Sequence, residues 1–500
     1  MTATIAPTSA ALPLAIPPLD RAAAAPLQEQ LSEALRAAVL SGRLKSGTRL
    51  PPTRQFAADL GVSRNTVAGA FDRLLAEGYL EARVGDGTYV ARALPDDLIR
   101  ARRPPAPVGG ADRAAGDLSQ RGSLLVAHPP SAARPGDCPA PRAFRAVLPA
   151  LDAFPRRAWG RLVERHLRRP DPALLGYGDP AGYRPLREVI AAYLGVTRGA
   201  RCEPDQVIVV GGSQQALDLA ARLLLDPGDA AAIEDPGYPG ARAALRAAGA
   251  DLRPVPVDAE GIVVGTALAG ARLVYTTPSH QFPLGATMSL ARRLALLDWA
   301  ARDGAWILED DYDGEYRYDG RPLPALQGLD GGGRVIYLGT FSKVLFPGLR
   351  LGYLVVPPAL ADAFAAARAL ADRGSPQLEQ AALADFIAEG HFARHIRRTR
   401  LLYLERQRAL VAAARRELAG LLEVRPAAAG MHLVGRLPAD ADDRAVWRRA
   451  AAHGVACLPL AACALAAPPF PGLVLGYAAP DIAEIEAGVA LLRAALRGDR

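Results

Sequence analysis

The chain has 500 residues, of which 50% are hydrophobic, and a formal net charge of +7. The length predicts about three domain-sized units, or one large and one small unit, and the lack of an apolar run of roughly 18 residues argues against a membrane span. The charge permits a nucleic-acid partner without showing one. The four cysteines lack metal-ligand spacing and no signal peptide precedes the first helix, so we expect a reduced, cytoplasmic, DNA-associated protein without a metal site.

Residues 21–91 are predicted to form a small unit that begins with an amphipathic helix. Leu27, Leu31, Leu35 and Val39 recur every four residues, so they would share one helix face. This face gives the small unit a candidate core.

A helix-turn-helix is predicted next along the chain. A short helix can begin at Thr53 and end before Gly61. Ser63 is a good N-cap for a second helix over residues 64–77, which Gly78 would stop. The two helices, joined by a short turn, have helix-turn-helix spacing.

Two strands over residues 79–84 and 88–90, around the glycine-rich turn 85–87, would add a wing. In such a unit the second helix enters the major groove by its N-terminus, where its first residues face base edges and phosphates. Backbone N–H groups at the start of the shorter helix favour phosphate, and a glycine in the wing allows close approach. The predicted DNA-binding residues are Thr53, Arg54, Ser63, Arg64, Asn65, Thr66 and Gly87.

This stretch resembles the GntR-family winged helix-turn-helix, which implies double-stranded promoter DNA as a partner. Residues 21–91 carry nine basic and seven acidic residues, so affinity would depend on placed arginines and on dimerisation rather than on bulk charge. The resemblance is carried by Leu50-Pro-Pro-Thr-Arg54, Leu60-Gly-Val-Ser-Arg64-Asn-Thr-Val67, Leu75-Ala-Glu-Gly-Tyr-Leu80 and Gly85-Asp-Gly-Thr-Tyr-Val90.

Residues 92–122 have no apolar period and are rich in Ala, Arg, Pro, Gly and Asp, which predicts a flexible linker. From residue 123 to 500, strands alternate with helices, which favours an α/β domain with a mainly parallel sheet. The last stretch of the chain mixes helix and strand and would form a smaller α+β subdomain. The predicted strands are Gln206–Val210, Ala230–Ile233, Arg272–Thr276, Ala305–Leu308, Arg334–Leu338 and Leu351–Val356.

Lys343 is the first candidate for chemistry in this domain. Only two of the 59 basic residues are lysines, Lys45 and Lys343. A chain so biased toward arginine keeps lysine mainly where an amine nucleophile is needed, because an amine forms a Schiff base with an aldehyde and a guanidinium does not. The phrase Gly339-Thr-Phe-Ser-Lys343 therefore indicates a pyridoxal 5′-phosphate (PLP) site.

PLP also needs a carboxylate for its ring nitrogen and a platform for its ring. Asp310 ends a predicted strand, and a carboxylate there would hold the ring nitrogen protonated. Tyr312, two residues on, can donate to the phenolic oxygen of the ring, and Tyr238 can stack on it. Glu309 and Asp311 would point to the other side of the strand.

Donors for the cofactor's phosphate are predicted at a helix start and in the segment around Lys343. Backbone N–H groups at Ser213 and Gln214 open a helix after two glycines. Hydroxyl groups and a guanidinium near Lys343 add further donors, namely Thr340, Ser342 and Arg350.

The whole region resembles fold-type I PLP aminotransferases, and with the N-terminal unit it resembles the MocR-type regulators (GabR- and PdxR-like). The phrases Thr277-Pro-Ser-His-Gln-Phe-Pro283, Glu309-Asp-Asp-Tyr312 and Gly339-Thr-Phe-Ser-Lys343 carry this resemblance. It implies an aminotransferase-like large domain that binds PLP. It also implies a homodimer, head-to-tail, in which Tyr177 reaches the partner's cofactor phosphate.

Two positions depart from the pattern of the enzymes. Phe282 stands where they have an asparagine that bonds the phenolic oxygen of the cofactor. Val474 stands where relatives have an arginine that clamps a substrate carboxylate, and its loss argues against ordinary amino-acid transamination. Arg242 or another arginine would have to compensate.

Three functions are compatible with these residues. The favoured one is a transcription regulator that senses PLP, or an amine or amino acid that reacts with it, with at most a residual half-reaction. The alternatives are a working PLP-dependent aminotransferase with an appended DNA-binding domain, and a constitutive DNA-binding protein whose large domain only dimerises.

Overall fold

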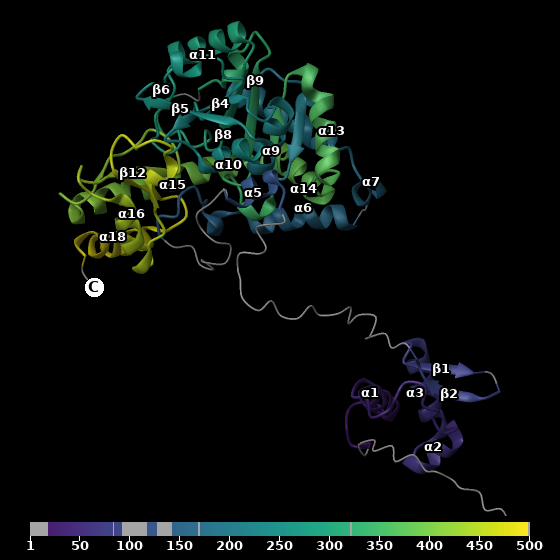
Figure 1. Cartoon of the computed structure of the whole chain (residues 1–500). Helices are drawn as coiled ribbons and strands as arrows, with labels where there is room; N and C mark the ends of the chain where they lie inside the picture. The colour runs from purple at the N-terminus through teal and green to yellow at the C-terminus, as the bar shows by residue number, and fades with distance from the viewer. Residues whose placement is uncertain are drawn as a thin grey trace, which may run out of the picture. The chain divides into compact units, whose positions relative to one another are not determined.

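The structure is a computed structural model, and it describes residues 19–83, 85–92, 118–127, 143–168, 171–320 and 323–498. The chain divides into two compact units, Met1–Gly116 and Asp117–Arg500 (Figure 1). Most of the predicted linker, residues 93–117, lies outside the described residues, and helix α5 (Gln120–Ala127) begins within the linker's last residues.

The smaller unit contains α1 (Leu27–Leu40), α2 (Thr53–Leu60), α3 (Arg64–Ala76), β1 (Leu80–Arg83) and β2 (Gly87–Val90). Three residues of the predicted apolar face of α1, Leu31, Leu35 and Val39, are buried with residues of α2 and α3 in one core, and Leu27 is half-buried. The strands pair antiparallel, with Arg83 opposite Gly87. These elements confirm the predicted winged helix-turn-helix.

The larger unit is built on an eight-stranded sheet with the order β3-β10-β9-β8-β7-β4-β5-β6. The pairs among β9, β8, β7, β4 and β5 are parallel, whereas β10 and β6 run antiparallel to their neighbours. The strands are β3 (Val207–Val210), β4 (Ala230–Asp235), β5 (Asp251–Asp258), β6 (Gly261–Ile262), β7 (Leu273–Thr276), β8 (Trp306–Asp311), β9 (Val335–Thr340) and β10 (Gly352–Val355).

Helices pack against the sheet. Apolar side chains of the strands and of these helices form three hydrophobic cores. Most strand residues are buried, as expected where helices cover a mainly parallel sheet. The helices are α6 (Arg156–Arg168), α7 (Pro172–Leu175), α8 (Arg184–Arg198), α9 (Ser213–Leu224), α10 (Pro239–Ala247), α11 (Leu290–Asp303), α12 (Leu326–Leu329), α13 (Ala361–Asp372) and α14 (Gln377–Ala388).

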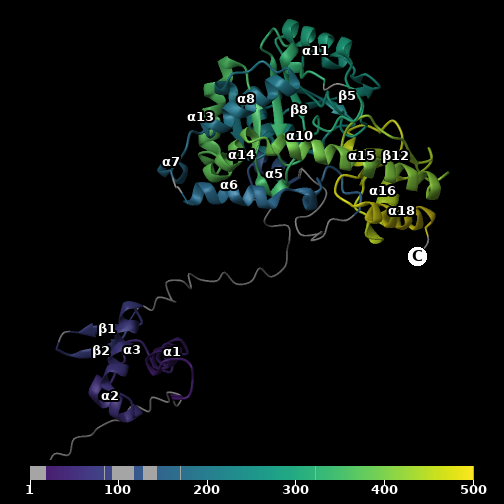
Figure 2. The same cartoon turned by 180° about the vertical axis from the view of Figure 1, so that it is seen from behind.

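The C-terminal elements form a smaller subdomain around a four-stranded antiparallel sheet with the order β11-β12-β14-β13. Both views show this subdomain in yellow and light green beside the larger sheet, with α15 leading into it (Figures 1 and 2). Its elements are α15 (His391–Glu417), β11 (Glu423–Val424), β12 (His432–Arg436), α16 (Asp443–Ala452), β13 (Leu458–Pro459), α17 (Leu460–Cys463), β14 (Gly472–Gly476) and α18 (Ile482–Arg497).

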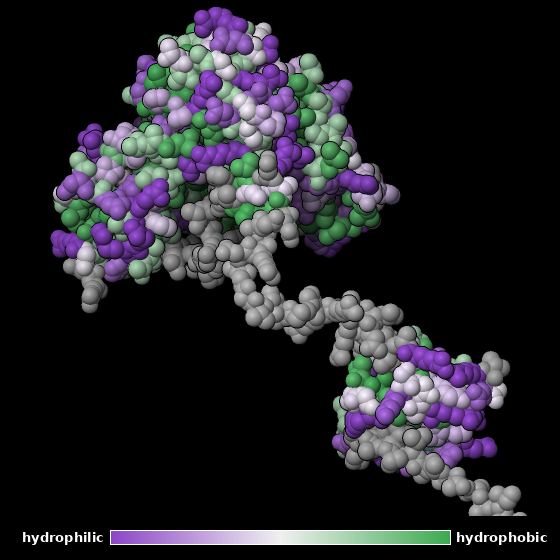
Figure 3. Space-filling model, viewed as in Figure 1, coloured by the Kyte–Doolittle hydropathy of each residue, from purple (hydrophilic) through white to green (hydrophobic). Residues whose placement is uncertain are grey.

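The surface of the described residues mixes polar and apolar side chains. Figure 3 shows hydrophilic side chains spread over the visible face of each unit. Within the part of the chain that the structure describes, no helix is both long enough and apolar enough to cross a membrane.

Candidate functional site

The carboxyl ends of β3, β8 and β9 meet at one edge of the large sheet. Gly352 of β10 pairs with Val210 at the end of β3 and with Thr340 at the end of β9. A Cβ on Gly352 would lie 3.2 Å from the Cα of Gly212, which is tighter than ordinary van der Waals contact, so a larger residue would push the loop after β3 outward. Ligands of α/β sheets bind at this edge.

Lys343 lies in the turn after β9 and is half-buried. Burial lowers the pKa of its amine, whereas the nearby Asp310 carboxylate raises it and Arg145 lowers it further. A lysine with a lowered pKa has a larger neutral fraction, and the neutral amine is the nucleophile that attacks an aldehyde.

Asp310 is buried in β8, and its two carboxylate oxygens have different hydrogen-bonding environments. Its Oδ2 accepts a hydrogen bond from the Tyr275 hydroxyl at 2.7 Å. Its Oδ1 is buried and has no hydrogen-bond partner among the described residues. Burial raises the pKa of Asp310 to about 7. A protonated ring nitrogen placed at Oδ1 would supply the missing donor.

The two neighbours of Asp310 are engaged in other contacts. Glu309 accepts hydrogen bonds from the backbone N–H groups of Leu326 and Gln327 at the start of α12. Asp311 forms an ion pair with Arg198, with 2.8 Å between Oδ2 and Nε. The alternation of a strand therefore separates Asp310 from both carboxylates.

A candidate anion site, here called the anion cradle, lies where the loop after β3 meets the turn after β9. No side chain caps the N-terminus of α9, whose first residue is Ser213. The guanidinium of Arg350 lies 3.4 Å from the place that a Cβ on Gly212 would take. Thr340 and Ser342, at the end of β9 and in the turn after it, are buried, and the Ser342 N–H donates to the Thr340 hydroxyl at 3.2 Å.

Gln214 and Tyr238 are also near this cradle. The Gln214 side chain donates to the carbonyl of Gly240 at 3.0 Å, so it ties α9 to α10 and leaves its backbone N–H as the donor for an anion. The Tyr238 ring packs over Gly240, where a Cβ would overlap it, and lies edge-on to Phe282 with centroids 5.8 Å apart.

Tyr177 is not part of this group. Its side chain is 85% exposed, and the guanidinium of Arg373 lies 5.3 Å from the ring centroid. Within one chain, the structure does not bring Tyr177 to Lys343.

Tyr312 has polar neighbours that the sequence did not reveal. Its hydroxyl lies 3.0 Å from Nδ1 of His280, and the same Nδ1 lies 3.0 Å from Oδ2 of Asp313. All three residues are buried. His280 stands in the phrase Thr277–Pro283 that carried the family resemblance, and Asp313 follows Tyr312 directly, so their place in these motifs was the only available signal.

The two departures from the enzyme pattern lie on the same side of the C-terminal sheet. Phe282 is buried between Tyr238, Tyr312 and Leu458. Val474 is fully buried in β14 and pairs with Leu458, whereas its neighbours in β14 belong to the core on the opposite face.

Arg242 does not take the place of the missing arginine, because it donates to the backbone carbonyls of Ala462 and Ala464. Arg145 is exposed and close enough to lower the pKa of Lys343. Its backbone lies against Gly476, two residues beyond Val474 on the same face of β14. Arg145 is therefore a site residue that the sequence did not single out.

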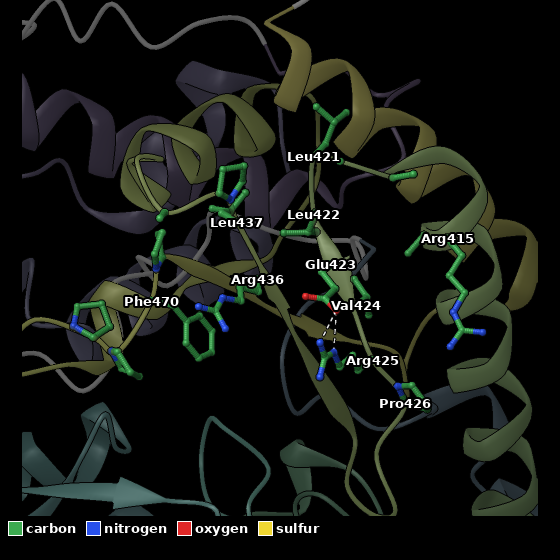
Figure 4. Close-up of a pocket in the computed structure, with 18 residues that line it drawn as sticks. Arg415, Leu421, Leu422, Glu423, Val424, Arg425, Pro426, Arg436, Leu437 and Phe470 are labelled. Atoms are coloured by element: carbon green, nitrogen blue, oxygen red, sulfur yellow. Dashed lines mark hydrogen bonds and ion pairs between the residues drawn. The ribbon is translucent and has the colours of Figure 1, made fainter.

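A cavity of about 1090 Å³ lies elsewhere, in the C-terminal subdomain. Figure 4 shows Arg425 paired with Glu423 and Arg436 beside Phe470 at its wall. None of the residues that line it belongs to the group around Lys343.

In the smaller unit, α3 presents its N-terminus to solvent. The Ser63 hydroxyl accepts from the Thr66 N–H at 3.0 Å, as predicted for an N-cap. Arg54, Arg64 and Asn65 are exposed. Gly87 has a φ of +130° and lies beside the Arg49 side chain.

Comparisons with known proteins fit both units. Residues 27–90 match the bacterial regulatory proteins of the gntR family, and residues 155–490 match the class I and II aminotransferases. The chain is 48% identical over 478 residues to the probable rhizopine catabolism regulatory protein MocR of Rhizobium meliloti, covering 95% of each chain. The chain belongs to the MocR-type regulators of the gntR family.

Other MocR-type regulators and an enzyme are also similar. The pyridoxine biosynthesis transcriptional regulator PdxR of Corynebacterium glutamicum is 32% identical over 424 residues, covering 85% of each chain. The α-aminoadipate aminotransferase LysN of Thermus thermophilus, solved with N-(5′-phosphopyridoxyl)-L-leucine, is 33% identical with a TM-score of 0.66, covering 71% of this chain and 92% of LysN. The predicted fold, a DNA-binding unit joined to a fold-type I aminotransferase-like domain, is thus confirmed.

Proposed function

We propose that this MocR-type regulator binds PLP through Lys343. Its affinity for promoter DNA would change when PLP, or an amine that reacts with PLP, occupies the site. The observation that carries the proposal is the pair formed by Lys343 and Asp310. One supplies an amine with a lowered pKa, and the other supplies a buried carboxylate oxygen without a partner. These are the two groups that the cofactor's aldehyde and ring nitrogen require.

The other residues fit the remaining parts of the cofactor. Ser213 and Gln214 would bind the phosphate through backbone N–H groups, and Thr340, Ser342 and Arg350 would add side-chain donors. Tyr312 would donate to the phenolic oxygen and Tyr238 would cover the ring. When bound, PLP supplies an aldehyde that forms a Schiff base with an amine and a ring that withdraws electrons.

Regulation requires that the ligand bind two arrangements of the protein with different affinity. We propose a head-to-tail homodimer whose two winged units contact the two halves of a promoter site. Occupation of the cofactor site would then favour one spacing of the winged units over the other. The DNA-binding residues would be Thr53, Arg54, Ser63, Arg64, Asn65, Thr66 and Gly87.

The test measures DNA binding and absorbance on the same protein. Addition of PLP to wild-type protein is expected to produce near-visible absorbance, and Lys343→Ala is expected to abolish it. Lys45→Ala removes the other lysine of the chain and is the matched control, which should keep the absorbance. An unchanged spectrum in Lys343→Ala would contradict the assignment of Lys343.

The affinity of wild-type protein for its own upstream DNA is then measured with and without PLP. A change in affinity or footprint supports cofactor-responsive regulation. An identical result in both conditions brings forward an amine effector or constitutive DNA binding.

A catalytic aminotransferase is the second candidate, favoured by the likeness of the large domain to the aminoadipate enzyme. Val474 counts against it, because no guanidinium stands at that place to bind a substrate carboxylate. Formation of a keto acid over many turnovers, in the absence of DNA, would support this candidate.

A further inference from the structure

Phe282 removes a polar partner from the cofactor site, and a buried histidine lies close by. Phe282 packs edge-on against Tyr312 with centroids 6.1 Å apart, and its ring offers no hydrogen-bonding atom. His280, two residues earlier, lies within 3.0 Å of the Tyr312 hydroxyl. The place of an amide donor near this hydroxyl is thus taken by an imidazole.

Asp313 decides which nitrogen of His280 carries the proton. A carboxylate only accepts hydrogen bonds, so Nδ1 of His280, 3.0 Å from Oδ2 of Asp313, must be the protonated nitrogen. The same N–H points between Asp313 and the Tyr312 hydroxyl oxygen. Tyr312 therefore accepts from His280, and its own proton is left for an acceptor on the other side.

The His280 ring is held in this position by close packing. Gly430, with a φ of +98°, lies directly against the ring, and a Cβ there would overlap it. A Cβ on Gly285 would lie 3.2 Å from Nε2 of His280. The His432 ring is 5.1 Å away and its Nε2 bonds to the Pro283 carbonyl at 3.0 Å. A ring fixed on several sides cannot turn its other nitrogen toward Tyr312.

We infer that His280, oriented by Asp313, is a positioning residue that makes Tyr312 a dedicated hydrogen-bond donor to the phenolic oxygen of the cofactor. This inference rests on the proposed binding of PLP at Lys343. It assigns to His280 and Asp313 the polar support that Phe282 does not provide. The site would then set the charge on the cofactor's oxygen without an amide at position 282.

The consequence is a defined change in a titration of the bound cofactor. A donor to the phenolic oxygen withdraws charge from it and weakens its hold on the proton that it shares with the lysine nitrogen. Loss of the donor therefore raises the pH at which the near-visible absorbance changes. The titratable groups that face Tyr312 and His280 are Asp310, Asp313, Glu234, Tyr477 and His432.

The experiment is a pH titration of absorbance on full-length, PLP-loaded protein. His280→Ala and Tyr312→Phe are each expected to raise the midpoint by about one unit, a ten-fold change in proton affinity. The double variant is expected to raise it no further, because both changes remove one hydrogen bond. Additive shifts would contradict the inference.

Two variants separate positioning from packing. Asp313→Ala removes the acceptor that keeps the proton on Nδ1, so the proton can move to Nε2 and Nδ1 can accept from Tyr312. This variant should shift the midpoint as Tyr312→Phe does. His280→Asn keeps an N–H near the position of Nδ1 and should restore the wild-type midpoint, which also covers the case in which His280→Ala does not fold. If the Asp313 variant keeps the wild-type midpoint and His280→Asn raises it, His280 does not orient Tyr312.

His166→Ala is the matched control, because it removes an imidazole that also lies beside a carboxylate, Asp385 at 2.9 Å, but has no contact with Tyr312. This control should leave the midpoint unchanged. A shift equal to that of His280→Ala would overturn the inference, because the loss of an imidazole away from Tyr312 would then have the same effect. Wild-type protein without near-visible absorbance would instead reject the proposed PLP binding itself, before any variant is compared.

Discussion

At the scale of single residues, the hydrogen bonds and ion pairs of neighbouring side chains determine which groups of the candidate site remain available to a ligand. Glu309, Asp310 and Asp311 are consecutive, but Glu309 caps α12 and Asp311 pairs with Arg198. Asp310 and Asp311 each keep a buried Oδ1 without a hydrogen-bond partner among the described residues, and only that of Asp310 belongs to a carboxylate outside these two contacts. Burial then raises the pKa of Asp310 to about 7. A carboxyl in this state is costly to ionise unless a cation faces it.

This cost gives a stability prediction for the cofactor-free protein. The pKa of Asp310 lies near 7 in the folded state and at about 3.9 in the unfolded chain, so between these values the folded state binds more protons. The free energy of unfolding should therefore decrease as the pH rises from about 4 to about 7, by at most about 4 kcal/mol from this group. Asp310→Asn should remove that part of the decrease.

Urea unfolding of both cofactor-free proteins at pH 5 and pH 8 measures the effect. The stability of wild type relative to Asp310→Asn should fall between these two pH values. Glu309, whose pKa burial also raises to about 7, is present in both proteins and cancels in the comparison. Parallel pH profiles would show that Asp310 ionises freely in the folded state.

At the scale of elements, local patterns predicted most of the fold. The four-residue spacing from Leu27 to Val39 and the Ser63 cap placed α1 and α3 because these signals act within one helix. Strand β5 was missed because Pro254 and Pro256 interrupt its pattern, although a prolyl residue is tolerated where its nitrogen is not needed by the ladder. The sequence therefore predicted an element correctly where the residues that determine the element lie within that same element.

The polar support of Tyr312 shows the opposite case. His280 follows β7 and Asp313 follows β8, and only the pairing of these strands brings the two side chains together. Spacing along the chain carries no such information, so neither residue could be assigned a role from the sequence. Lys343 and Asp310 could be predicted as site residues from the sequence because each has a chemical reason of its own.

The N-terminus of α3 carries a prediction for DNA binding. Arg64→Ala should weaken binding and reduce the slope of log affinity against log salt by about 1 if the guanidinium meets a phosphate. Arg73→Ala is the matched control on the same helix, since Arg73 pairs with Glu29 and Glu77 within the unit.

Both α3 variants are measured by titration of promoter DNA at several salt concentrations. Their cofactor absorbance should stay as in wild type, because α3 belongs to the other compact unit. Equal salt slopes for Arg64→Ala and wild type would remove Arg64 from the phosphate contacts.

At the scale of the whole molecule, the exposed Tyr177 gives the proposed dimer a direct test. If Tyr177 completes the partner's phosphate site, Tyr177→Ala should weaken PLP binding about ten-fold, the loss of one charge-assisted hydrogen bond. Mixed dimers of Tyr177→Ala and Lys343→Ala subunits should regain one intact site, which combines Lys343 of the first subunit with Tyr177 of the second.

Absorbance of the mixed dimers, formed by co-expression with two tags, is the measurement. Half of the wild-type signal with wild-type affinity is the expected result. A signal that keeps the weak affinity of Tyr177→Ala would place Tyr177 outside the partner's site.

The contact between the His280 ring and Gly430 joins the loop after β7 of the large sheet to the loop that precedes β12 of the C-terminal sheet. A tilt of the C-terminal subdomain that moved Gly430 away from the imidazole would free the His280 ring to turn, and the Tyr312 hydroxyl would lose the contact that orients its proton. The absorbance of the bound cofactor would then depend on the orientation of the C-terminal subdomain. An absorbance spectrum could therefore detect a conformational change of the regulator before any DNA is added.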